Sequence, residues 1–323
     1  MRMPKHIWLA LVGGLAGCDG RHSWLAGAGA EARLIEDLFW PFLIGAVAIW
    51  TAVMVFAVIA FRRRPKGSDE RIGRAIILWG GGVLPAVVVA ALLITGLLTL
   101  RAMASRPSAL TVHVDAEQWW WRVIYETPDG KVFSANEIRL PLGKTTLLML
   151  TSDDVIHSFW APALGGKLDM IPGRTNRMTL TPVRTGRWGG LCAEFCGAAH
   201  AQMRFEVVVM EPDAFRDWLV AESEPAAPSA LRMERGLSLF LDEGCAACHT
   251  VRGTQANGRV GPDLTHLAAR GRIGAGLLAL SDANLRRWIT HTTDVKPGVR
   301  MPSYPAMPPD DLDQITQFLM ALE

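Results

Sequence analysis

Two long apolar runs without a charged side chain constrain this 323-residue chain more than any other feature. The first runs from 38 to 61 and the second from 75 to 100. At about 1.5 Å per residue the shorter run makes a helix of ~36 Å, which exceeds the ~30 Å hydrocarbon core of a bilayer. Pro85 lies inside the second run and predicts a kink. Buried core helices are rarely uncharged over such lengths, so we expect a two-helix transmembrane hairpin spanning 35–104.

The loop between the two runs is strongly basic. It carries Arg62, Arg63, Arg64, Lys66, Arg71 and Arg74. Because short cytoplasmic loops are enriched in Lys and Arg, this loop belongs on the cytoplasmic side of the membrane. Both ends of the hairpin then face outward, and everything after Leu100 should lie on the periplasmic or outer side.

Residues 1–18 have the features of an export signal. Arg2 and Lys5 precede a short apolar stretch, 7–12, that cannot span a bilayer. The sequence Leu-Ala-Gly-Cys18 then resembles the bacterial lipoprotein cleavage box, in which the cysteine becomes the lipidated first residue. We favour this reading over an ordinary signal peptide with an incidental cysteine. Export of the N-terminus agrees with the orientation of the basic loop.

After the hairpin, residues 109–221 change to short alternating runs separated by Pro and Gly turns. Examples of these runs are 111–114, 176–180 and 204–209. Apolar side chains at a period of two, in strands this closely spaced, predict an all-β sandwich or barrel. A helix that starts at Pro212 should close the domain, because proline is favoured in the first helical turn.

This domain contains a dense set of soft metal ligands. Within twelve residues lie Cys192, Cys196, His200 and Met203. Sulfur and imidazole together select copper, with zinc as the main competitor, and the thioether favours copper. A disulfide between the two cysteines is the alternative in an oxidising compartment. The added histidine and methionine argue against it.

A Pro/Ala/Ser-rich linker, 222–230, separates this domain from a last one, 231–323. The last domain carries Cys245-Ala-Ala-Cys248-His249, the attachment signature of a c-type haem. A thioredoxin-like redox pair or half of a zinc site is the alternative. No second Cys pair follows the motif to complete a zinc site, and no βαβ pattern surrounds it.

The region from about 35 to 220 resembles cytochrome c oxidase subunit II, whose outer domain is a cupredoxin-like barrel with a dinuclear CuA centre. The match rests on the hairpin, the Gln-Trp-Trp-Trp run at 118–121, the segment 169–176 and the copper motif. The resemblance implies that two thiolates bridge the coppers, that two imidazoles are terminal ligands, and that a thioether and one backbone carbonyl are weak axial ligands. In this sequence the bridging thiolates would belong to Cys192 and Cys196, and the terminal imidazoles to His157 and His200. Met203 would supply the thioether and Glu194 the backbone carbonyl.

The same resemblance implies three further roles. The Glu194 side chain would face subunit I at an interfacial magnesium site, and Trp119 matches the tryptophan through which the family receives electrons. Barrel packing or a docking surface is the alternative for Trp119. Family members also carry a glutamate near the start of the second helix for proton uptake. Here the nearest carboxylate is Glu70, which either substitutes or leaves proton uptake to another arrangement.

The last domain resembles class I cytochromes c in two segments, Gly261–Leu264 and Met301–Pro305. By this resemblance Met301 is the second axial haem ligand, with Met307 as its rival, and the Pro262 carbonyl positions His249. A terminal helix over 310–319 should pack on the first helix of the domain. The two remaining histidines of this domain, which we interpret as surface or polar-contact residues, are His266 and His291.

Together these features predict a multidomain membrane protein: a two-helix transmembrane hairpin, an all-β cupredoxin-like barrel and an all-α class I cytochrome c domain. Such a fusion resembles subunit II of the caa3-type cytochrome c oxidases. It would lie in the bacterial inner membrane with both outer domains on the periplasmic side. It would relay electrons from cytochrome c or a bc-type complex, through haem c and CuA, to subunit I, alongside other oxidase subunits. The net charge of +2 indicates no nucleic-acid partner.

Other functions fit parts of the pattern. A quinol oxidase subunit lacks copper ligands, and a nitrous oxide reductase lacks the hairpin. A CuA-containing subunit of a nitric oxide reductase, or a membrane-tethered electron carrier or copper-handling protein, would keep both features. The Pro172-Gly173-Arg174 segment and Glu194, interpreted as contacts with subunit I, favour the oxidase.

Overall fold

The computed structural model describes residues 20–62, 70–104 and 107–323. They fall into two compact units: the hairpin from Arg33 to Arg106, and the residues up to Ala32 together with Pro107–Glu323. Cys18 and the rest of the expected lipoprotein signal lie outside the described residues, as does most of the basic loop.

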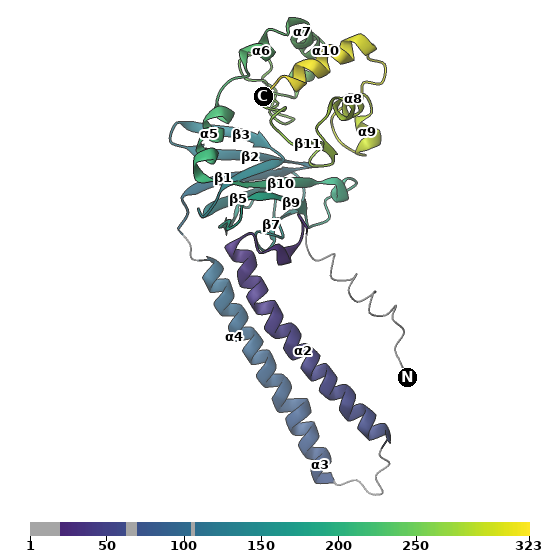
Figure 1. Ribbon diagram of the computed structural model, residues 1–323. Helices are drawn as coiled ribbons and strands as arrows, with labels where there is room; N and C mark the ends of the chain where they lie inside the picture. The colour runs from purple at the N-terminus through teal and green to yellow at the C-terminus, as the bar shows by residue number, and fades with distance from the viewer. Residues whose placement is uncertain (1–19, 63–69, 105–106) are drawn as a thin grey trace, which may run out of the picture. The chain divides into compact units, whose positions relative to one another are not determined.

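The hairpin consists of two candidate membrane-spanning helices (Figure 1). The first is α2, Ala30–Arg62, and the second joins α3, Glu70–Ala75, the π-helical η3, Ile76–Val83, and α4, Leu84–Ala104. Both helices are longer than the apolar runs, because polar residues at the ends of each run continue the same helix. The large apolar side chains of the hairpin are mostly exposed, as expected for helices that face lipid.

The irregularity expected at Pro85 takes the form of π-helical turns. These turns end at Val83, where Leu84 N–H donates to the Trp79 carbonyl, and α4 begins directly before the proline. Proline has no N–H for the helical ladder and its ring clashes with the preceding turn. A wider π turn next to it is a recognised way to accommodate such a break.

The outer β domain is a sandwich of two five-stranded sheets. The first sheet has the order β3-β2-β1-β5-β8, with the bounds β3 Gly130–Ala135, β2 Trp120–Thr127, β1 Leu110–Glu117, β5 Thr146–Ser152 and β8 Asn176–Leu180. The second has the order β4-β10-β9-β6-β7, with the bounds β4 Glu137–Pro141, β10 Arg204–Met210, β9 Gly186–Cys192, β6 His157–Trp160 and β7 Leu168–Met170. The pairs β1–β5 and β4–β10 are parallel and the others are antiparallel.

The core between the sheets follows the predicted alternation. Along β1, Val112 and Val114 are fully buried while their neighbours are half-buried. At the centre Phe205 stacks on Phe159, with ring centroids 4.6 Å apart, and meets Trp121 edge-on at 5.0 Å. The helix expected from Pro212 is α5, Pro212–Ser223, and its aromatic side chains pack on this domain. The predicted all-β sandwich is confirmed.

An N-terminal segment, which contains the short helix η2, Trp24–Ala26, also belongs to the sandwich. Ala28 N–H donates to the Ala163 carbonyl at 2.8 Å, and the Glu31 carboxylate accepts from Thr181 N–H at 2.8 Å. Ala28 and Glu31 are both buried. This return of the chain to the barrel has no counterpart in the sequence pattern.

The C-terminal domain is helical. Its elements are α6 Pro228–Leu231, α7 Glu234–Asp242, η5 Cys245–Ala247, α8 Asp282–Thr290, α9 Thr292–Val295 and α10 Pro309–Met320, with a small hairpin of β11 Arg272–Ile273 and β12 Leu278–Ala279. Helix α10 packs closely on α7, where a Cβ at Gly236 would lie 2.7 Å from Cβ of Phe318. The predicted packing of the terminal helix on the first helix is confirmed. The segment expected to be a linker contains α6 and the buried side chains of Ala226 and Ala230.

Candidate functional site

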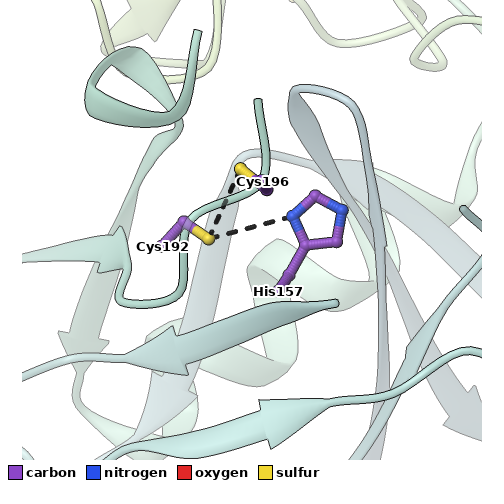
Figure 2. A group of neighbouring side chains, drawn as sticks. All are labelled: His157, Cys192 and Cys196. Atoms are coloured by element: carbon purple, nitrogen blue, oxygen red, sulfur yellow. Dashed lines mark hydrogen bonds between the residues drawn. The ribbon is translucent and has the colours of Figure 1, made fainter. Parts of the chain in front are cut away.

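The second sheet brings two distant segments together at one end of the sandwich (Figure 2). His157 is the first residue of β6 and Cys192 the last of β9, and these strands pair antiparallel with Phe159 opposite Cys192. The loop from β9 to β10 holds the other sulfur and imidazole groups. Cys192 N–H donates to the Met203 carbonyl at 3.0 Å, which closes this loop at its base.

All six groups expected to hold copper converge at this end of the sheet. The Sγ atom of Cys192 lies 3.8 Å from Sγ of Cys196, 3.8 Å from Nδ1 of His157 and 3.1 Å from the Glu194 carbonyl. The Sγ atom of Cys196 lies 3.5 Å from Nδ1 of His200 and 3.8 Å from Sδ of Met203. Both cysteines are buried free thiols, so the disulfide alternative is not what this fold holds.

The donor set fits copper. Two thiols, two imidazole nitrogens, a thioether and a carbonyl oxygen are soft to intermediate donors, which suit copper. Structural zinc sites are closed by four Cys or His donors, and the fully buried Met203 thioether in contact with Cys196 has no place in such a set. Paired thiols with one imidazole beside each sulfur match a site for two ions.

The electrostatics of this loop favour the thiolate form at one of the two cysteines, Cys192. The hydrogen bond with Cys196 lowers the pKa of Cys192 to about 3, and the proton that the pair shares raises the pKa of Cys196. Burial acts to lower the pKa of His157, but the hydrogen bonds to Cys192 and Asp154 raise it above its ordinary value. A metal ion would displace the remaining protons, because thiolate and neutral imidazole are the ligating forms.

Asp154 orients one of the imidazoles. Its Oδ1 lies 2.9 Å from Nε2 of His157, which turns Nδ1 toward the sulfur of Cys192. Its Oδ2 accepts from Gln118 N–H at 2.7 Å. Carboxylates in this position fix the ring orientation of metal-ligating histidines. The sequence analysis did not single out Asp154, and its place three residues before His157 was the one available signal.

Trp119 packs in the barrel and contacts the copper loop. It is 8% exposed and belongs to the sandwich core, so it packs in the barrel. Its indole Nε1–H donates to the Cys196 carbonyl at 2.9 Å, and the same carbonyl accepts from Nε2 of Gln118 at 2.7 Å. The Trp119 ring is therefore bonded to the backbone of a ligand residue.

A cavity of about 270 Å³ lies where the C-terminal domain meets the sandwich, and its lining includes Trp119 and Asn136 of the sandwich. The C-terminal domain contributes Cys245, Cys248 and His249 to it, with apolar side chains such as Phe240 and Leu264. Nδ1 of His249 lies 2.8 Å from the Pro262 carbonyl, as predicted, and donates to it. Burial lowers the pKa of His249, so its imidazole is neutral. Two adjacent thiols and a neutral imidazole in an apolar pocket fit a c-type haem.

Both candidate methionines border this cavity. Met301 and Met307 are each half-buried and line it, so the packing alone does not separate them. The two histidines interpreted as polar-contact residues lie elsewhere: His266 is buried, with its ring nitrogens 2.6 Å and 3.1 Å from backbone oxygens, and His291 is exposed beside Thr290. His266 is therefore a polar-contact residue rather than a surface one.

The two segments interpreted as contacts with subunit I lie at the surface of the sandwich, and Pro172-Gly173-Arg174 is exposed. The Glu194 side chain is half-buried, and Phe195 beside it is 77% exposed. Glu70, the nearest carboxylate to the missing family position, begins α3 and forms an exposed ion pair with Arg74 at 3.0 Å.

Comparison with known proteins gives a consistent result. Residues 130–211 match the family model of the cytochrome c oxidase subunit II periplasmic domain, and residues 233–323 match that of cytochrome c. The chain is 32% identical to the cytochrome c oxidase subunit 2 of Alkalihalophilus pseudofirmus over 96% of its own length and 94% of that protein. It is 30% identical to the protein of the same name from Bacillus sp. PS3, over 81% and 80%.

Among solved structures, the periplasmic domain of subunit II of cytochrome oxidase from Bradyrhizobium japonicum is 32% identical. It covers 36% of this chain and 95% of its own, with a TM-score of 0.35.

Proposed function

Because this chain belongs to the cytochrome c oxidase subunit II family and carries a fused cytochrome c domain, we propose that electrons pass through it from haem c to a dinuclear copper site and on to subunit I. When bound, a haem c and a copper pair would each accept and release one electron at a time. The protein supplies ligands, spacing and insulation from water for this transfer.

The copper ions would be held by the convergent loops of the sandwich. Cys192 and Cys196 would supply the thiolates and His157 and His200 the imidazoles. The Met203 thioether, 3.8 Å from the Cys196 sulfur, and the Glu194 carbonyl, 3.1 Å from the Cys192 sulfur, would complete the ligand set. Burial of both cysteines supports this assignment, since it keeps the thiolates from oxidants and solvent.

The haem would be held by the cavity between the C-terminal domain and the sandwich. Cys245 and Cys248 would form the thioether links, and His249, oriented by the Pro262 carbonyl, would bind iron through Nε2. Met301 would be the second axial ligand, which raises the reduction potential relative to a second histidine.

The observation that carries the relay is the position of Trp119. Trp119 is among the residues that line the proposed haem cavity, and its Nε1–H donates to the carbonyl of Cys196. One buried side chain thus borders the haem cavity and is hydrogen-bonded to the copper loop. This favours Trp119 as the path by which the copper site receives electrons.

The partners follow from the family and the hairpin. The two candidate transmembrane helices anchor the chain, and we propose a bacterial inner membrane with both outer domains on the periplasmic side. Subunit I and other oxidase subunits would receive the electrons, with cytochrome c or a bc-type complex as the donor. A magnesium ion shared with subunit I would bind at the Glu194 side chain.

Replacing one bridging thiolate tests the assignment. We expect Cys192→Ser, in the full chain purified with its complex, to abolish the copper optical and EPR signals and to stop electron transfer beyond haem c. The haem spectrum should persist, because its cavity shares no ligand with the copper loop. His291→Gln, at an exposed residue in neither site, is the matched control. Intact copper signals in Cys192→Ser, or loss of both chromophores together, would contradict the proposal.

A further inference from the structure

The haem domain is hydrogen-bonded to the copper barrel along a continuous seam. The contacts, from barrel to haem domain, are Arg204 N–H to Ala275 O at 3.0 Å, Gln202 Nε2 to Val295 O at 3.4 Å, Arg122 Nη2 to Arg259 O at 2.9 Å and Arg139 Nη2 to Ala269 O at 3.0 Å. In these four contacts each acceptor is a backbone carbonyl of the haem domain.

One contact of this seam runs in the opposite direction and is buried. Lys296, which directly follows α9, is 1% exposed. Its Nζ donates to the carbonyl of Trp119 at 2.6 Å and to that of Gly274 at 3.1 Å. Burial lowers the pKa of its ammonium to about 7. A buried lysine whose partners are carbonyls costs folding free energy, and an apolar side chain would fill the same space more cheaply.

The Trp119 carbonyl, which accepts from Lys296, belongs to a turn that is hydrogen-bonded to the copper loop. Gln118 and Trp119 join β1 to β2, and both side chains donate to the carbonyl of Cys196. Gln118 N–H also donates to Asp154, the carboxylate that orients His157. Holding the backbone of this turn therefore fixes the Trp119 ring against the copper loop.

The loop that begins at Lys296 packs against the same ring. A Cβ at Gly298 would lie 2.8 Å from Cη2 of Trp119 and 3.5 Å from Cβ of Ala198, so no larger residue fits there. Gly298 also has a φ of 84°, which favours glycine. Met301, the proposed haem ligand, ends this loop. The short segment that packs on the indole thus begins at Lys296, which bonds to the Trp119 carbonyl, and ends at Met301.

We propose that Lys296 is a positioning residue that locks Trp119 between the copper loop and the haem domain and so sets the rate of electron transfer between the two centres. The inference rests on the relay proposed above. In the step concerned one electron leaves the haem iron, which goes from ferrous to ferric, and enters the copper pair, which is reduced by one electron. No proton and no other reactant takes part.

The test is the rate of this single step in the full chain with both cofactors bound. Flash reduction of the haem, followed by absorbance at the copper band, gives the rate, and redox titration gives the two potentials. We expect Lys296→Met to slow the step on the order of tenfold or more, as small misplacements of reacting groups do. Both spectra should be retained. The exposed Lys144→Met is the matched control and should leave the rate unchanged.

A second variant covers the case in which Lys296→Met loses a chromophore. Lys296→Gln keeps an N–H donor on a shorter side chain and should give an intermediate rate with both spectra present. A merely structural lysine would change stability but not the rate at unchanged potentials. If a variant with both spectra and unchanged potentials transfers electrons at the wild-type rate, the role of Lys296 is refuted. If the wild type itself shows no transfer from haem to copper, the proposed relay fails instead.

Discussion

Two methionines compete for one coordination position, because Met301 and Met307 both line the haem cavity. We expect Met301→Leu to remove the absorption band of methionine-bound ferric haem and to give a high-spin or alternatively ligated spectrum. Leucine conserves the volume of methionine, so the fold should lose less than about 1.5 kcal/mol. Absorption and EPR spectra of the ferric protein provide the measurement.

Met307→Leu is the paired variant for that experiment. It removes the same thioether from the same cavity wall and should leave the ferric spectrum as it is in the wild type. The opposite pattern, with the band lost only in Met307→Leu, would assign the iron to Met307 and reject the cytochrome c resemblance at this position.

Single residues differ in how well the sequence predicted them. Most of the proposed copper and haem ligands could be singled out, because Cys, His and Met at fixed spacings are chemically rare and local. Asp154, Gln118 and Lys296 were not, since ordinary polar residues carry no local sign of the distant carbonyl or imidazole that they contact. His266 shows the same limit, because its burial depends on the ends of α5 and α10.

Among the elements, β9 and β10 matter most for the copper site, because they carry Cys192 and lead from Met203. They pair with Gly190 opposite Phe205, and a Cβ at Gly190 would lie 2.1 Å from Cε2 of that ring. We expect Gly190→Ala to destabilise the sandwich by about 1–3 kcal/mol, the usual cost of overpacking a core. Denaturant unfolding followed by tryptophan fluorescence measures this loss.

Phe205→Leu in the same chain is the internal control for Gly190→Ala. The smaller side chain makes room for the new methyl group, so the double variant should lose less stability than the sum of the single changes. Additive losses would show that the two residues do not meet across the strands.

The sequence predicted whether a segment is a helix or a strand more accurately than it predicted where the element begins and ends. Strands such as β8 and β10 coincide with the expected alternating runs, because a half-buried strand records its register in its side chains. The membrane helices extend beyond the apolar runs, since hydropathy marks the lipid-facing part of a helix and not its ends. The π turns of η3 have no hydropathy signal at all.

For the whole molecule, the order of the hairpin, sandwich and haem domain followed from the sequence, and the contacts between distant parts did not. The N-terminal segment is the clearest case. A Cβ at Gly29 would lie 2.0 Å from the Leu164 carbonyl, so the chain runs directly against the barrel there. Such a contact needs only small residues and backbone groups, which have no pattern in the sequence.

This contact predicts that the outer domains alone are less stable than the full chain. A soluble fragment of residues 107–323 lacks Ala28 and Glu31, which are buried on the barrel and bonded to Ala163 and Thr181. At about 0.5–1.5 kcal/mol for each hydrogen bond, we expect the sandwich to lose about 1–3 kcal/mol from these two bonds. Thermal unfolding of the fragment and of the detergent-solubilised chain, both with copper bound, gives the comparison.

A peptide of residues 20–32 distinguishes this cause from a general effect of truncation. Added in excess, it should raise the melting temperature of the fragment by mass action, because it binds only the folded sandwich. The same peptide with Glu31→Ala should raise it less, since Thr181 N–H then loses its carboxylate acceptor. The segment does not stabilise the barrel if the fragment and the full chain have the same melting temperature and the two peptides have equal effects or none.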